Sequence, residues 1–199
     1  MRFHKIISTI LHPIVVPTIG VMLYFLLISN NLMSNQKLMI LSLVFVVTYL
    51  IPLLFLIVLK KVKIIKSYQT ESIKERKIPV AVMIVIFYLL GNTINSIVFL
   101  RDLSLLFYAT TLGLILIYLL FFFKIKTSIH LLSLGISAGF FMILSYNYSQ
   151  SFLWIIIIIL MLSGVLASAR LHLKAHTSKE VYIGFFIGIT TPILLNLFL

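Results

Sequence analysis

Long apolar stretches alternate with short polar clusters along the whole chain. Seven stretches of about 20 residues are predominantly apolar, and they cover residues 8–29, 38–59, 79–99, 103–123, 128–147, 151–169 and 181–199. A helix needs about 20 apolar residues to cross the hydrocarbon core of a bilayer. The runs are continuous, whereas the strands of a membrane barrel would alternate apolar and polar residues. The pattern predicts an all-α, polytopic membrane bundle with six to seven transmembrane helices.

Two details of the apolar stretches bear on packing. His12-Pro13 interrupts the first stretch and is expected to kink it, because proline removes a helix hydrogen bond. The fifth stretch carries small residues through 133–139, and Gly184 and Gly188 in the last stretch are spaced to form a face of small residues. Such faces let helix backbones approach closely in membranes. We therefore expect the fifth helix to be central and the last to pack on the fifth or sixth.

Composition supports a membrane location. Of the 199 residues, 62% are hydrophobic and 10% are charged, whereas soluble domains are about 45–50% apolar. The connections are too short to hold a soluble domain, so residues 1–199 are expected to form one transmembrane domain. The chain contains no cysteine, which excludes disulfides and thiol chemistry.

Polar residues gather in three clusters, each separated from the next by two apolar stretches. We name them the first cluster (residues 71–79), the second cluster (126–130) and the third cluster (170–180). Since two crossings return the chain to the side it left, all three are expected at one membrane face. The N-terminus shares that face, and only Lys37 and Arg101 of the 16 lysines and arginines lie on the other. Basic residues favour the cytoplasmic side, so we expect the N-terminus and the clusters to face the cytoplasm from a bacterial inner membrane.

The formal net charge of +12 also raises the question of nucleic acid. No basic face interleaved with aromatic residues lies outside the apolar stretches, as nucleic-acid binding would require. Attraction to anionic lipid headgroups explains the basic run at 60–66 more simply. We expect membrane lipids as partners and no nucleic acid.

The third cluster carries the sharpest chemistry. Arg170 is followed after five residues by His176 and, after three more, by Glu180. A carboxylate four residues after a histidine on a helix can accept one imidazole N–H and leave the other nitrogen as a nucleophile or base. A basic interfacial patch with a glutamate at a helix start is the alternative. His172, His176 and Glu180 also resemble a metal-binding face, but the other clusters supply cations rather than carboxylates, so we expect no metal and no other cofactor.

The second cluster places Lys126, Ser128 and His130 at the start of a predicted helix. A helix start offers unpaired N–H groups and a positive dipole end, which suit an anion, and His130 could act as a general acid. A simple helix cap at Ser128, with His130 at headgroup level, is the alternative.

The first cluster offers Lys74 and Arg76 just before Pro79, where the third helix is predicted to begin. A solvated charge run is the alternative. The preceding connection, 60–78, is the longest in the chain and the only one expected to be able to fold over a site.

Taken in order, the clusters resemble the type 2 phosphatidic acid phosphatase superfamily, membrane lipid phosphatases whose helical bundle is shared with vanadium haloperoxidases. The family pattern is Lys and Arg-Pro, then Pro-Ser-Gly-His, then Ser-Arg, five residues, His, three residues and Asp. This chain has Arg76 two residues before Ile78-Pro79, then Thr127-Ser128-Ile129-His130, then Ala169-Arg170, His176 and Glu180. Glutamate replaces the aspartate, and the second motif lacks Pro and Gly. The resemblance runs from Arg76 to Gly188, within a core of about residues 70–199.

The resemblance implies roles for these positions. His176 would form a phosphohistidine, Glu180 would orient it, and His130 would protonate the leaving alcohol. Arg170, Arg76 and the amides around Ser128 would hold the phosphate, with Lys74 or Lys126 in place of the family's lysine. The substrate would be a lipid phosphomonoester or a polyprenyl diphosphate.

Two other functions stay open from the residues. A catalytically eroded relative could serve as a structural subunit of a larger membrane assembly, with other membrane proteins as partners. A carrier could use the basic clusters as a station for an anionic lipid or small anion.

Overall fold

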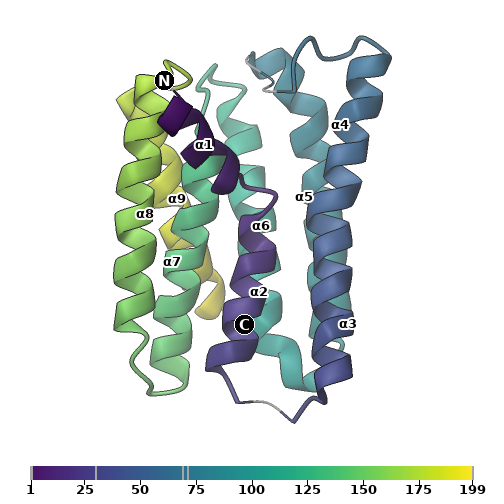
Figure 1. The fold of residues 1–199 in the computed structure, drawn as a ribbon, viewed down its shortest axis with the longest axis vertical. Coiled ribbons are helices and arrows are strands. Elements are labelled where there is room, and N and C mark those ends of the chain that lie inside the picture. The colour runs from purple at the N-terminus through teal and green to yellow at the C-terminus, as the bar shows by residue number, and fades with distance from the viewer. Residues whose placement is uncertain (1, 30, 69, 71, 199) are drawn as a thin grey trace.

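A computed structural model describes residues 2–29, 31–68, 70 and 72–198 as a bundle of helices lying mostly lengthwise (Figure 1). In chain order these are α1 (Arg2–Ile10), α2 (Val16–Leu27), α3 (Ser34–Phe45), α4 (Ile51–Lys61), α5 (Ile73–Asn95), α6 (Arg101–Leu120), α7 (Ile129–Asn147), α8 (Leu153–His172) and α9 (Ser178–Asn196). A π-helical segment, η1 (Val46–Leu50), joins α3 to α4, and a 3-10 turn, η2 (Val98–Leu100), precedes α6. The predicted all-α class is confirmed.

Within the described residues, six helices are long and apolar enough to cross a membrane: Ser34–Lys61, Ile73–Asn95, Val98–Leu120, Ile129–Asn147, Leu153–His172 and Ser178–Asn196. The chain is therefore an integral membrane protein. The predicted first span, 8–29, is wrong as a single helix, because the chain leaves the helical path between α1 and α2, around His12-Pro13. The 12 residues of α2 extend about 18 Å, which is short of a bilayer core of about 30 Å.

The start of α5 also differs from the prediction. The helix begins at Ile73 rather than at Pro79, which lies inside it. Ser72 and Glu75 form a capping box: the Glu75 N–H donates to Ser72 Oγ at 3.3 Å, and the Ser72 N–H donates to Glu75 Oε2 at 3.4 Å. Because this pair satisfies the first free N–H groups of the helix, the helix starts earlier and the connection before it is shorter than predicted.

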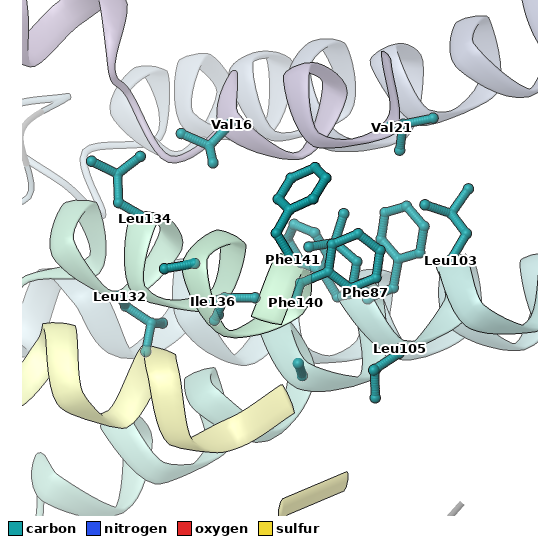
Figure 2. Packing of buried hydrophobic residues seen from close by; sticks show 14 of the residues in the cluster. Val16, Val21, Phe87, Leu103, Leu105, Leu132, Leu134, Ile136, Phe140 and Phe141 are labelled. Atoms are coloured by element: carbon teal, nitrogen blue, oxygen red, sulfur yellow. The ribbon is translucent and has the colours of Figure 1, made fainter. Parts of the chain in front are cut away.

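Helix α7 is the centre of the bundle, as predicted. Its buried side chains share one hydrophobic core with those of α2, α5 and α6, and Phe87, Phe140 and Phe141 are among the core residues drawn in Figure 2. Helix α9 crosses α7 at glycines: a Cβ added at Gly188 would lie 2.4 Å from the Leu132 carbonyl oxygen, and one at Gly184 would lie 2.5 Å from that of Ser128. The predicted packing of the last helix against the fifth predicted span is confirmed.

Helices α4, α6 and α8 end in the same way. A lysine adopts a left-handed conformation just after each helix, with φ of 61° at Lys63, 58° at Lys124 and 53° at Lys174. In each case the next N–H donates back to a carbonyl in the last turn, as from Ala175 to Arg170 at 3.1 Å. This Schellman geometry closes the helix and reverses the chain. The connections after α6 and α8 are thereby fixed at the bundle end that also holds α1 and the start of α5, drawn uppermost in Figure 1.

Candidate functional site

The three clusters meet at this end of the bundle and are joined by hydrogen bonds. Arg76 Nη1 in the first cluster donates to the Thr127 carbonyl at 3.1 Å. The Ser128 N–H donates to the Glu180 carbonyl at 3.1 Å, and Lys126 Nζ donates to the Ala175 carbonyl at 2.9 Å. These bonds join the start of α5, the connection between α6 and α7, and the connection between α8 and α9. Side chains far apart in sequence thus form one local structure.

His176 and Glu180 are in direct hydrogen-bond contact. His176 Nδ1 lies 2.7 Å from Glu180 Oε2, and the histidine side chain is only 1% exposed. The expected same-helix geometry is wrong, because His176 precedes Thr177, the N-cap of α9. The Thr177 N–H donates to the same Glu180 oxygen at 3.3 Å, and the Glu180 N–H donates to Thr177 Oγ1 at 3.4 Å. The capping box therefore positions the Glu180 carboxylate that contacts Nδ1 of His176.

Burial and positive charge keep the His176 ring neutral. Burial contributes most to lowering its pKa below the ordinary value of 6.5, and the charges of Arg76, Arg170 and Lys126 lower it further. In the tautomer that donates its Nδ1–H to Glu180, Nε2 carries the lone pair. This nitrogen is buried and has no hydrogen-bond partner. The arrangement leaves one imidazole nitrogen in a form that can act as a nucleophile or base.

Two arginines contribute buried positive charge. The Arg76 guanidinium is buried and also donates from Nε to the Thr70 carbonyl at 2.8 Å. Arg170 donates from Nη1 to Ser8 Oγ at 2.7 Å, while its Nε is buried without a partner. Arg76 is thus largely held by backbone carbonyls, and Arg170 keeps an unused donor.

Further polar atoms at this place lack partners. Thr127 Oγ1 and Ser128 Oγ are buried and unpaired, as are Arg170 Nε and His176 Nε2. Buried polar atoms are nearly always hydrogen-bonded, so each exception needs an explanation. Ser128 is the N-cap of α7, but its side chain makes no capping bond. Its backbone N–H already serves Glu180 and cannot also hold an anion, which corrects the expected role of that amide.

A cavity of about 1010 Å³ opens next to these groups and is lined by Arg76, His130 and Arg170 from the three clusters. Helix α1 adds Lys5, Ser8 and Thr9 to this wall, and the mainly apolar remainder comes largely from α2, α4, α5, α6 and α7. On α5 the lining extends from Arg76 to Phe87, about 16 Å at the helical rise. Ala175 lines the cavity and His176 does not, so the imidazole lies behind the wall. The cavity joins a charged end to an apolar interior.

His130 lies at the charged end of the cavity. Its Nε2 is 3.3 Å from the Ser8 carbonyl oxygen, and the His12 ring meets it edge-on at 5.0 Å between centroids. Arg170 and His176 are both close enough to interact with it electrostatically. The two predicted catalytic histidines therefore lie in one neighbourhood.

The structure separates other expected residues from the cavity. Lys74 is exposed, and none of Lys74, Lys126 and Ser128 lines it. The suggested metal face does not form, because the His172 ring stacks on His4 at 4.1 Å instead. Among the residues with described positions, no group of three or more metal-ligating side chains comes together.

Sequence reasoning missed Ser8, which contacts both Arg170 and His130. A signal was present: His4, Ser8 and His12 recur every four residues before the first proline. That spacing marks one face of a helix.

Comparison of the chain with models of known protein families, with curated proteins and with solved structures finds no match.

Proposed function

We propose that this protein is a membrane-embedded lipid phosphatase that hydrolyses a lipid phosphomonoester or a polyprenyl diphosphate through a phosphohistidine on His176. The observation that carries the proposal is the set of four unpaired buried polar atoms, on Thr127, Ser128, Arg170 and His176. Three of them belong to hydrogen-bond donors, and they lie beside two partly or fully buried guanidinium groups. A phosphate group, with several acceptor oxygens and negative charge, satisfies such donors.

The first step forms a nitrogen–phosphorus bond. His176 Nε2 attacks phosphorus with its lone pair. Glu180 accepts a hydrogen bond from Nδ1–H and stabilises the positive charge that the ring gains. The bond between phosphorus and the leaving oxygen, of an alcohol or of the second phosphate, breaks, and His130 in its doubly protonated form gives that oxygen a proton and becomes neutral. Arg170 and Arg76 stabilise the charge on the remaining oxygens.

The second step releases phosphate. His130, now lacking its proton, takes one from a water molecule as that water attacks phosphorus. The nitrogen–phosphorus bond breaks, and its electrons return to His176 Nε2. Because His176 does not line the cavity, the reaction requires the short 175–177 connection to shift when substrate binds. The apolar interior of the cavity would hold the lipid chain, and a bacterial inner membrane with the site on its cytoplasmic side is part of the proposal.

The test is phosphate release by the purified protein in nanodiscs, from short-chain phosphatidate and from farnesyl diphosphate. His176→Ala should abolish release, whereas Lys179→Ala, which removes an exposed charge of the same cluster, should retain it. Mass spectrometry should find a phosphoryl group on His176 in samples quenched without acid, because acid hydrolyses phosphohistidine. Release that persists in His176→Ala would refute the mechanism.

Other outcomes favour the alternatives. Absence of release, with stable co-purification of other membrane proteins, would support a structural subunit of an assembly. Flux of an anionic lipid across liposomes without hydrolysis would support a carrier.

A further inference from the structure

Helix α1 lies across the site with its polar side inward. Ser8 is 8% exposed, whereas Phe3, Ile6 and Ile10 are 67%, 56% and 60% exposed. His4 of the same helix stacks on His172 at the end of α8. A short helix with one apolar and one polar side is suited to lie in a membrane interface. Helix α1 can therefore be accommodated in two positions, over the site or at the lipid surface.

Ser8 contacts Arg170 and His130, the two groups that would bind a phosphate ester. Its hydroxyl accepts from Arg170 Nη1 at 2.7 Å, and its carbonyl lies 3.3 Å from His130 Nε2. Ser8 belongs to the last turn of α1, where helix carbonyls lack partners within the helix. Two oxygen atoms of one residue therefore engage the proposed phosphate-binding arginine and the proposed acid.

Neutral oxygens hold a guanidinium less strongly than phosphate does. Hydrogen bonds between ionised partners are about twice as strong as neutral ones, so a phosphate dianion should displace Ser8. The segment between Ile10 and Val16 is not helical and contains Pro13, which gives α1 a place to swing. No helix backbone has to break for α1 to move.

We propose that α1 is a lid over the site, held closed by Ser8, which stands in for two oxygens of a phosphate ester. The lid opens when a phosphate takes over Arg170 and His130, and α1 then lays Phe3, Ile6 and Ile10 into the membrane interface. This inference rests on the proposed function only in that the ligand is a phosphate.

The first test measures affinity for inorganic phosphate and for orthovanadate by calorimetry on the full chain. Ser8→Ala removes the competing hydroxyl and should tighten binding about 2- to 10-fold, the range of one competing hydrogen bond. Ser168→Ala is the matched control, because it removes an exposed hydroxyl of α8 that does not line the cavity, and its affinity should equal that of the unchanged chain. Equal or weaker binding by Ser8→Ala would overturn the lid, and weaker binding would make Ser8 a positioning residue for Arg170.

The second test leaves Ser8 intact. The chain has no cysteine, so spin labels on Thr9→Cys and Ser168→Cys, both exposed positions, report the distance between α1 and α8. Orthovanadate should lengthen that distance. Hydrolysis of phosphatidate with an unchanged distance would refute the lid and leave the phosphatase standing. A lengthened distance without any hydrolysis would support the lid and refute the phosphatase.

Discussion

The close crossing of α7 and α9 offers a quantitative test of how the fold supports the site. At Gly184 an added Cβ would lie 2.5 Å from the Ser128 carbonyl oxygen, and at Gly139, farther along the same crossing, 2.5 Å from that of Ile189. These oxygens belong to backbone, so neither can move aside without shifting a helix. At Gly164 in α8 an added Cβ would meet nothing within 4 Å. Alanine at these three positions therefore separates packing from helix propensity.

Each substitution gains the same propensity, about 1 kcal/mol, so the difference from Gly164→Ala isolates the clash. Overpacking costs about 1–3 kcal/mol, and both Gly184→Ala and Gly139→Ala should lose that much relative to Gly164→Ala. Reversible unfolding in mixed micelles measures the free energies. Only Gly184→Ala displaces Ser128 and the start of α9, so only this variant should also weaken phosphate binding. Equal stability of Gly184→Ala and Gly164→Ala would refute the packing argument.

Three further outcomes are expected. The pKa of His176 is lowered in the folded protein, so the unfolded chain takes up a proton first as pH falls below 6.5. The free energy of unfolding should therefore decrease below pH 6.5, and it should decrease less in His176→Gln. Denaturation at pH 7.5, 6.5 and 5.5 measures both. Lys174→Gly should raise the unfolding free energy by about 1 kcal/mol, because glycine adopts the left-handed conformation without strain, and an unchanged midpoint in the same assay would count against this. Arg76→Lys cannot keep both bonds to the Thr70 and Thr127 carbonyls and should cost about 2 kcal/mol, a loss that thermal unfolding would detect.

The bundle could be predicted from sequence because hydrophobic length and small-residue spacing are local signals. Apolar runs located the six long spans, and Gly184 and Gly188 indicated the contact with α7. The polar clusters also indicated which connections share one end, since each pair of crossings returns the chain. How the side chains bond there could not be read from sequence, because those bonds join connections that lie far apart along the chain.

The N-terminal segment shows where local signals fail. An apolar run from residue 8 onward satisfies the length criterion for a span, yet Pro13 breaks it and α1 turns across the site. The connection before α5, the expected cover, is shortened because Ser72 and Glu75 start that helix early, although its Tyr68 and Thr70 line the cavity. Burial of Thr127 and Ser128 depends on Gly184 of α9, so no property of residues 126–130 alone could predict it.

The glutamate at position 180 shows how structure and proposed chemistry constrain one side chain together. Its Oε2 reaches the Thr177 N–H at 3.3 Å and His176 Nδ1 at 2.7 Å. A capping box requires a side chain at the third helical position long enough to bond back to the N-cap N–H, which glutamate provides. The phosphatase pattern proposed from the sequence has aspartate at this position, one methylene shorter. Here the longer side chain both caps α9 and holds the imidazole, so the difference from the family pattern is compatible with an oriented histidine rather than evidence against one.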